Sequence, residues 1–174
     1  MNHLIKKVVI SLIIITLSAF NFARAEDTSP VADTNTYQVL DKDMQRQIKC
    51  LAKNIYFEAR GESEKGKIAV AQVTVNRSNH DDYPDSICEV VEQKTVDVKT
   101  KKAICQFSWA CKPKSQLKVD LDGYYESYEI AKKVLLEGVK IDKLADALYF
   151  HSVSARPMWN KKPLLSIGNH VFYR

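Results

Sequence analysis

The stretch from Asp43 to Ser78, DMQRQIKCLAKNIYFEARGESEKGKIAVAQVTVNRS, carries the clearest helical pattern in the 174-residue chain. In its first half, apolar residues recur at spacings of three and four, at Ile48, Leu51, Ala52, Ile55 and Ala59. This spacing predicts a helix over residues 43–60 with Gly61 as its C-terminal stop. Ser63 can cap a second helix that runs to Ser78. The apolar stripe expected on this second helix consists of Ile68, Ala71 and Val75, widened by Val70 and Val73.

Two shorter elements are predicted after this pair of helices. Pro84 is placed as the first residue of a short third helix that ends near Gln93, because proline is favoured at the first helical position. The polar and charged residues 94–102 are expected to form an exposed loop. The apolar and aromatic residues 104–109 are expected to form a short strand.

A longer helix is predicted in the second half of the chain. Asp122 is expected to cap it and Gly138 to end it. Glu129 precedes Lys133 by four residues, which is the spacing of a stabilising ion pair on a helix. Its expected shared face consists of Tyr124, Tyr128, Ala131 and Leu135.

The C-terminal part of the chain carries strand patterns. Residues 147–151 are expected to form one strand, and residues 164–167 and 170–173 are expected to form a hairpin. Gly168-Asn169 would close this hairpin, because both residues tolerate the positive φ of a tight turn. Together these patterns predict an α+β fold, mainly helical, with a small antiparallel β element near the C-terminal end.

The first 25 residues have the features of a cleaved signal peptide. Lys6 and Lys7 precede an apolar run over residues 8–20, and Ala23-Arg24-Ala25 is a small-x-small cleavage site. A membrane anchor is the alternative, but the apolar run is shorter than the roughly 20 residues that a spanning helix needs. We therefore expect an exported protein of the periplasm, cell wall or extracellular space, without a stable membrane span after processing.

Cleavage after Ala25 would leave 149 residues, the size of one domain with its own core. Residues 26–42 are expected to be a flexible arm and residues 43–174 the catalytic domain. The net charge falls from +5 to +2 on cleavage, because three cations and no acid leave with residues 1–25. So small a charge does not predict nucleic-acid binding.

All four cysteines lie in the mature chain, at Cys50, Cys88, Cys105 and Cys111. An even number of cysteines in an exported protein predicts two disulfides, for which three pairings are possible. Cys105 and Cys111 are close enough in sequence to close a local loop, which would leave Cys50 for Cys88. Zinc ligation is the alternative, but the chain has no pair of cysteines two residues apart.

Glu58 is the strongest candidate for a catalytic residue. It follows Leu51 by seven residues and Ile55 by three, so it lies on the apolar side of the first predicted helix. Burial and a place in the last helical turn both disfavour the carboxylate anion and are expected to raise the pKa of Glu58. A carboxyl group that stays protonated near neutral pH can donate a proton to a glycosidic oxygen. The alternative is an ion pair between Glu58 and Arg60 or another cation.

Other residues are candidates for a second acid or for a sugar-binding surface. Glu62 and Glu64 follow Glu58 closely, although Glu64 is better explained as part of a solvated helix start. Of Tyr149 and Phe150, which alternate on a strand, one is expected to face the core, and His170 can instead bind a backbone carbonyl. The proposed substrate-binding residues are Glu62, Gln106, Ser108, Trp109, Tyr149, His151, Trp159, Asn169 and His170.

An ordered set of motifs resembles the SleB/CwlJ-type cell wall hydrolases over residues 48–174. It comprises NIYFEARGE at 54–62, AVAQV at 69–73 with Asn76-Arg77, Pro84, CQFSW at 105–109, YFH at 149–151, Pro157 with Trp159, and IGNHVFY at 167–173. The resemblance implies a compact lysozyme-like domain that cleaves the glycan strands of peptidoglycan, with Glu58 as the essential acid.

Relatives of this type known from spore germination act as lytic transglycosylases. In that reaction the 6-hydroxyl of the muramic residue attacks, so no second carboxylate is needed as a nucleophile. This agrees with a chain in which only Glu58 is convincingly placed on an apolar helix face. The chain has no visible wall-binding repeat, so general wall remodelling is a better expectation than specificity for the spore cortex.

Other functions remain open at this point. A metal-dependent amidase or peptidase would use His151, His170 and an acid, although these histidines show no H-x3-H spacing. A cysteine amidase would need an unpaired thiol. A wall-binding module would hold the glycan without cutting it. The chain is expected to act on peptidoglycan as a monomer, without a cofactor or a metal.

Overall fold

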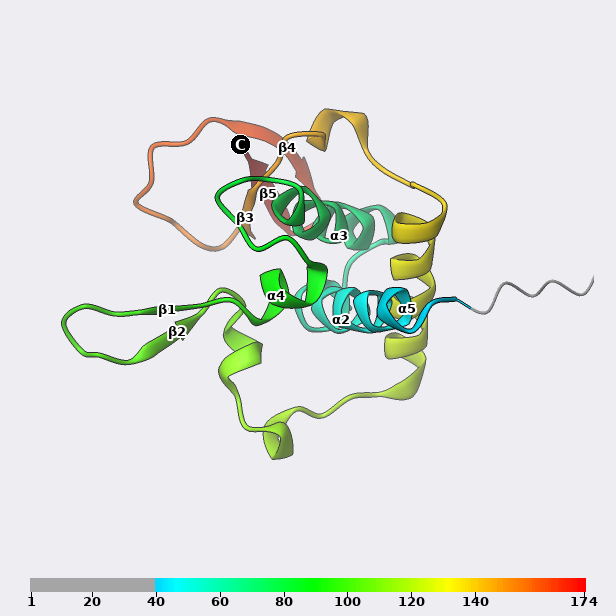
Figure 1. Cartoon of the computed structure of the whole chain (residues 1–174). Coiled ribbons are helices and arrows are strands. Elements are labelled where there is room, and N and C mark those ends of the chain that lie inside the picture. The colour runs from blue at the N-terminus through cyan, green and yellow to red at the C-terminus, as the bar shows by residue number, and fades with distance from the viewer. Residues whose placement is uncertain (1–39) are drawn as a thin grey trace, which may run out of the picture. The chain divides into compact units, whose positions relative to one another are not determined.

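The computed structural model of this protein describes residues 40–174 (Figure 1). The predicted signal peptide and residues 26–39 of the predicted arm lie outside the described residues. The helices are α2 (Lys42–Ala59), α3 (Glu64–Ser78), α4 (Ile87–Glu92) and α5 (Leu121–Leu136), with short 3₁₀ helices at Ser108–Cys111, Lys114–Gln116 and Asp142–Leu144. The strands are β1 (Lys94–Val96), β2 (Ala103–Cys105), β3 (Tyr149–Ser152), β4 (Pro163–Ile167) and β5 (His170–Tyr173).

Helix α2 forms where the apolar spacing predicts it. Its buried residues include Ile48, Leu51 and Ile55, which pack in one core cluster with Ile130 and Ala131 of α5. The helix ends at Ala59, where the backbone N–H of Arg60 still donates to the Tyr56 carbonyl. The first predicted helix is therefore confirmed to within one residue at each end.

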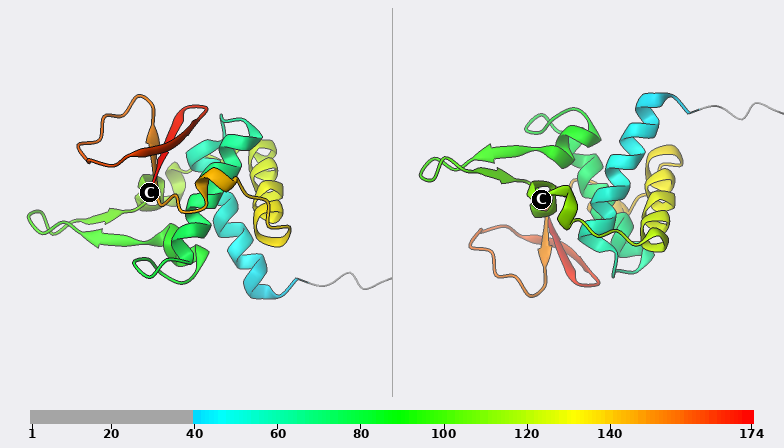
Figure 2. Two further views of the ribbon diagram at one scale, coloured as in Figure 1. Left: turned by 90° about the horizontal axis from the view of Figure 1, so that it is seen from above. Right: turned by 90° about the horizontal axis from the view of Figure 1, so that it is seen from below.

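Helix α3 is the central helix of the described residues, and the two further views in Figure 2 show it enclosed by other elements. The Ser63 hydroxyl caps it by accepting a hydrogen bond from the Gly66 N–H, as predicted. Burial is not confined to the predicted stripe, because helix α3 is contacted by three helices and two strands. These are α2, α4, α5, β3 and β4. Ile68 and Val75 of that stripe are only partly buried. The residues of α3 that are buried are Gly66, Lys67, Ala69, Val70, Ala71, Gln72, Val73, Thr74 and Arg77.

The segment after α3 differs from its prediction in three ways. Helix α4 begins at Ile87, and its cap is Ser86, whose hydroxyl accepts from the Glu89 N–H; Pro84 lies before the helix, so its predicted place was wrong. Residues 94–102 are not a simple loop, because β1 pairs antiparallel with β2. In this exposed hairpin the second strand stops at Cys105, and residues 108–111 are 3₁₀ rather than extended.

The long helix α5 begins two residues earlier than predicted. Asp120, not Asp122, is the cap: its carboxylate accepts from the Gly123 N–H and also from the Tyr56 hydroxyl of α2. Lys133 pairs with Glu64 of α3, while Glu129 pairs with Lys132, so the predicted i,i+4 pair does not form. Gly138, with φ +68°, follows the end of the helix as expected.

The face of α5 that contacts the core is also shifted from its prediction. Its fully buried residues are Ser127, Ile130, Ala131 and Val134. Of the predicted face, Tyr124, Tyr128 and Leu135 are only partly buried, although they pack against the same core cluster.

Strands β3, β5 and β4 form an antiparallel sheet in that order. The predicted hairpin of β4 and β5 is confirmed, with Gly168 at φ +55° in its turn. Phe150 of β3 packs against both core clusters, so it is the member of the Tyr149-Phe150 pair that faces the core. The α+β class, mainly helical with small antiparallel sheets, is therefore confirmed.

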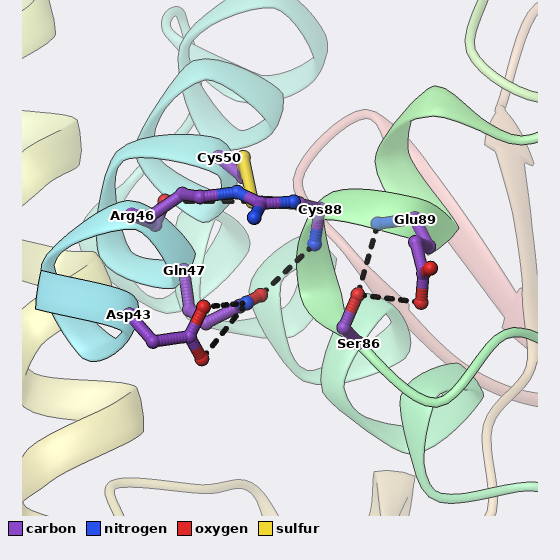
Figure 3. Close-up of a disulfide and its surroundings, with 7 residues drawn as sticks. All are labelled: Asp43, Arg46, Gln47, Cys50, Ser86, Cys88 and Glu89. Atoms are coloured by element: carbon purple, nitrogen blue, oxygen red, sulfur yellow. Dashed lines mark hydrogen bonds between the residues drawn. A yellow bond between two sulfur atoms is a disulfide. The ribbon is translucent and has the colours of Figure 1, made fainter.

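Two disulfides reinforce the fold. Cys50 of α2 is bonded to Cys88 of α4, and Cys105 is bonded to Cys111, which confirms the predicted pairing. Figure 3 shows that Gln47 supports the first bond, because its side-chain oxygen accepts from the Cys88 N–H at 3.1 Å. Within residues 40–174, no helix has both the length and the apolar character needed to cross a membrane.

Candidate active site

Glu58 lies in the last turn of α2 and is partly buried. Burial raises the pKa of this carboxyl group, while the positive charge of Arg77 lowers it; burial is the larger effect, so the net shift is upward. Arg60, the predicted alternative partner, donates instead to the Tyr56 hydroxyl at 3.1 Å. The surroundings of Glu58 therefore favour its protonated form, and Arg60 is not paired with it.

Arg77, at the C-terminal end of α3, is the cation whose charge lowers the pKa of Glu58. Its side chain is almost fully buried, and its Nε donates to the Leu148 carbonyl at 2.8 Å. The guanidinium lies 5.3 Å from the centre of the Tyr83 ring and 5.5 Å from that of Phe107. Within the described residues its Nη1 has no hydrogen-bond partner, so one donor remains in this enclosed position.

Trp109 lies against α2 within one turn of Glu58. Its ring stacks on Phe57 at a centroid distance of 4.7 Å, and its Nε1 donates to the Asn54 side chain at 3.3 Å. Asn54 is held in turn by donating to Thr74 of α3 at 3.0 Å. Because residues 54 and 58 are neighbours on one helix face, the indole is fixed beside the turn that carries Glu58.

A second aromatic group lines the outer side of β3 and β5. Tyr149, His151, Trp159 and Tyr173 have ring centroids 5.2 to 5.9 Å from their neighbours. The His151 Nε2 is 2.8 Å from the Tyr173 hydroxyl, and its Nδ1 is 2.7 Å from the Ser152 carbonyl. Trp159 keeps 38% of its surface exposed. The group therefore presents an accessible aromatic face.

Tyr149 connects this aromatic group to Arg77 and Glu58. Burial and a hydrogen bond with Tyr149 raise the pKa of Tyr83 to about 12, so the Tyr83 phenol stays neutral at ordinary pH. Tyr83 and Tyr149 are also the hydroxyl groups that act most strongly on the Arg77 charge. The structure therefore brings Glu58, Arg77, Tyr83 and Tyr149 into one electrostatically linked cluster.

Glu62 occupies a different position, at the β4–β5 turn. Its carboxylate accepts from the backbone N–H of Asn169 at 3.1 Å and from the Asn169 side chain at 3.0 Å. These bonds lower the pKa of Glu62, the backbone bond most. A β-carbon on Gly168 would collide with this carboxylate, so only glycine fits there. Glu62, with its side chain 8% exposed, thus joins the α2–α3 connection to the turn.

His170 belongs to the same contact. Its Nδ1 is 3.8 Å from the Glu62 carboxylate, and its ring meets the edge of Phe150 at a centroid distance of 5.3 Å. Burial lowers the pKa of His170, which favours the neutral ring. The alternative of a bond to a backbone carbonyl is not found at Nδ1, which has no hydrogen-bond partner in the described part of the chain.

Gln106 and Ser108 are exposed and belong to neither aromatic group. The Gln106 N–H donates to the Gln93 carbonyl, which continues the β1–β2 hairpin. Gln106 adjoins a cavity of about 200 Å³, which is also lined by Gln93, Thr95, Ile104 and Cys105. Within residues 40–174, no hydrogen bond or ion pair joins Gln106 or Ser108 to Glu58.

Sequence reasoning missed three residues of the site. Arg77, Tyr83 and Tyr173 contact the predicted residues through tertiary packing, which local spacing does not predict. A basic residue at the end of a helix whose other faces are apolar was the available signal for Arg77.

The structure bears on the two alternative enzyme classes, the cysteine amidase and the metal-dependent amidase or peptidase. All four cysteines are in disulfides, so none is an available nucleophile. His151 has both ring nitrogens within hydrogen-bonding distance of protein atoms, and His170 faces Glu62. Among residues 40–174, no group of three potential ligands could hold a metal ion.

Residues 61–173 match the family model described as Cell Wall Hydrolase. Glu58 lies three residues before this matched segment, so the match itself does not identify it. Similar proteins include the spore cortex-lytic enzyme of Bacillus cereus, 26% identical over 154 residues that cover 85% of this chain and 51% of the relative. That of Bacillus subtilis is 26% identical over 129 residues, or 72% and 36% of the two chains. This chain thus spans about half the length, or less, of these relatives.

Two solved structures are also similar. The catalytic domain of the Bacillus cereus SleB protein has 20% sequence identity and a TM-score of 0.48, covering 75% of this chain and 91% of that one. The catalytic domain of the germination-specific lytic transglycosylase SleB from Bacillus anthracis has 20% identity and a TM-score of 0.49, with coverages of 75% and 95%.

Proposed function

This chain belongs to the cell wall hydrolase family, and from that membership we propose that it cleaves the glycan strands of peptidoglycan with Glu58 as the general acid. The observation that carries the assignment of Glu58 is its environment. It is a partly buried carboxyl group in a last helical turn, with a raised pKa and a single nearby cation. A protonated carboxyl group is the form that a leaving glycosidic oxygen requires.

The reaction starts with transfer of the Glu58 proton to the glycosidic oxygen as the bond from that oxygen to the anomeric carbon breaks. The resulting Glu58 carboxylate faces the positive charge of Arg77, which stabilises the anion. In the second half, the carboxylate takes the proton of the attacking hydroxyl as its oxygen bonds to the anomeric carbon. Glu58 thereby returns to its protonated form, and the proton balance closes.

The attacking group distinguishes a lytic transglycosylase from a muramidase. In the first, the 6-hydroxyl of the muramic residue attacks; in the second, water attacks. Glu62 is the nearest acid along the chain, but Asn169 occupies both of its oxygens with hydrogen bonds. Because Glu62 is committed to the β4–β5 turn, a single-acid transglycosylase is the form of the reaction that we favour.

The aromatic groups supply the binding surface in this proposal. Trp109 stacks on Phe57 of α2, next to Glu58 in the sequence. Tyr149 of β3 and Trp159, which packs against it, supply further aromatic surface. Aromatic faces stack on the apolar faces of sugar rings, which fits a glycan strand. Asn169 acts through the turn rather than on the sugar, since its backbone and side-chain N–H groups both donate to Glu62. His170 lies beside the same carboxylate.

The site of action in the cell is part of the same proposal. The two disulfides are typical of an oxidising compartment, and the peptidoglycan substrate lies outside the cytoplasm. We propose that residues 1–25 direct export and that the processed chain acts as a monomer in the periplasm or cell wall.

The test replaces Glu58 by glutamine, which preserves the shape of the side chain but removes the proton donor. We expect Glu58→Gln to lose at least about 100-fold in the release of soluble fragments from purified peptidoglycan. Mass spectrometry of the wild-type products should show anhydro ends; reducing ends would indicate a muramidase, and free stem peptides an amidase.

The matched control is Glu64→Gln, because Glu64 is an exposed acid six residues away that pairs only with Lys133 among the described residues. It should retain wild-type activity. Equal digestion by wild type and Glu58→Gln would refute the assignment of Glu58. Full loss of activity with EDTA that zinc restores would instead favour the metal-dependent amidase.

A further inference from the structure

The positive charge of the described residues is concentrated in the last part of the chain. Residues 40–174 contain 23 lysine and arginine residues against 18 acids. From residue 147 onward there are four cations and no acid, so four of the five net charges lie in 28 residues. Such a separation of charge within one domain favours an anionic ligand on that part of the surface.

Three of these cations lie in the connection between β3 and β4, which we call the basic loop, residues 153–162. They are Arg156, Lys161 and Lys162. Within residues 40–174, no carboxylate lies within 4.0 Å of any of them, whereas Arg174 pairs with Asp146 at 3.2 Å. In Figures 1 and 2 the loop projects from the sheet on the side opposite α5. Its cations are therefore available to a ligand.

Contacts to the aromatic group hold one end of the basic loop in place. The Lys161 Nζ lies 3.8 Å from the centre of the Tyr149 ring, and Trp159 packs against Tyr149 at 5.7 Å and Tyr173 at 5.7 Å. A lysine over an aromatic face keeps its charge while its position is restricted. The loop thus holds the Lys161 ammonium group in a restricted position beside the exposed Trp159 ring.

Tyr149 connects Lys161 to the cluster that contains Arg77 and Glu58. The same residue contacts Lys161 and acts on the charge of Arg77, which in turn acts on Glu58. A glycan stacked on the exposed Trp159 ring would therefore place its substituents within reach of the basic loop.

We propose that the basic loop is a subsite for the carboxylate groups of peptidoglycan, with Lys161 as its central residue. The inference rests on the proposed function. These carboxylates belong either to the stem peptides or, where no peptide is attached, to the lactyl group of muramic acid. The subsite would make the enzyme prefer acidic glycan over neutral glycan of the same length.

The experiment compares native peptidoglycan with the same material after carbodiimide and ammonia have converted its carboxylates to amides. For wild type we expect an apparent KM about five-fold higher on the amidated material, with kcat unchanged. The variant Arg156→Gln/Lys161→Gln/Lys162→Gln should show that higher KM on both materials. Strands freed of stem peptides by an amidase identify the source: a low KM retained there indicates the lactyl carboxylate, and a high KM indicates the stem peptides.

The matched control is Lys112→Gln/Lys114→Gln/Lys118→Gln, which removes the same charge from three exposed lysines outside the basic loop. It should leave the KM difference intact. The inference is overturned if wild type does not distinguish native from amidated material, or if both triple variants change KM equally. Co-sedimentation with the two materials measures the same preference by binding alone, so absence of cleavage would count against the proposed function without deciding on the subsite.

Discussion

Arg77 opposes the effect of burial on Glu58. Burial favours the neutral acid, which the proposed reaction needs for its first proton transfer, whereas the guanidinium favours the anion that would form after it. A proton donor that must also regain its proton benefits from both influences. The residue that adjusts this balance is on α3, and the acid is on α2.

Replacing Arg77 by glutamine should move the alkaline limb of the kcat profile to higher pH. The cation lowers the pKa of Glu58, so its removal raises that pKa and keeps the acid protonated further into the alkaline range. Steady-state rates across the pH range measure the shift.

The variant Arg77→Lys serves as the control, because it retains the charge while losing the planar guanidinium. Its limb should lie closer to that of wild type than the limb of Arg77→Gln does. If the glutamine variant shifts the limb to lower pH, the electrostatic role of Arg77 is wrong. Thermal unfolding of both variants separates this effect from loss of the Leu148 contact.

The two residues also differ in how far sequence predicts them. The position of Glu58 followed from apolar residues three and seven places before it, all on one helix. Arg77 acts on a residue 19 positions away through tertiary packing, so no local spacing relates the two. The alternative partner Arg60 was plausible because it is close in sequence, but its guanidinium donates to the Tyr56 hydroxyl.

At the scale of elements, the contact between Glu62 and the β4–β5 turn holds the sheet to the helices. We expect Glu62→Ala to lower the free energy of unfolding by about 1 to 2 kcal/mol, since two charge-assisted bonds to Asn169 are lost. Urea unfolding at neutral pH measures this. Glu64→Ala is the control and should have little effect, because its bond to Lys133 is solvent-exposed.

The same contact predicts a dependence of stability on pH. The pKa of Glu62 is lowered in the folded state, so its contribution is complete above the ordinary value of 4.5. That contribution is lost as the pH falls through the lowered pKa of the folded state. Glu62→Gln cannot ionise, and its unfolding free energy should therefore fall less steeply in this acid range than that of wild type. Parallel acid profiles for the two proteins would contradict this role.

Element boundaries were predictable where local signals were unopposed. Ser63 caps α3 as expected, but Asp120 rather than Asp122 caps α5, because the Tyr56 hydroxyl of α2 also binds Asp120. The β1–β2 hairpin was missed because it is exposed on both faces over most of its length, so its strands lack the apolar alternation that marks a half-buried strand.

For the whole molecule, the two disulfides should contribute unequally. Cys50 and Cys88 are 38 residues apart, against six for Cys105 and Cys111. By loop-closure entropy the first bond contributes about 4 kcal/mol and the second about 2 kcal/mol. Urea unfolding of Cys50→Ala/Cys88→Ala and of Cys105→Ala/Cys111→Ala should show the larger loss in the first pair. The reverse order would mean that native-state packing, not the unfolded chain, determines their effects.

The strand order of the C-terminal sheet has a consequence for how the site comes into being. β5 lies between β3 and β4, yet it is the last of the three to leave the ribosome. Until it arrives, β3 and β4 have no partner in this sheet, Tyr149 lacks Tyr173 opposite it, and Glu62 lacks Asn169. The aromatic face and the turn contact are therefore completed together, in one late step. A chain that has not yet formed β5 would hold Glu58 and Trp109 without the aromatic surface that β3 and β5 share.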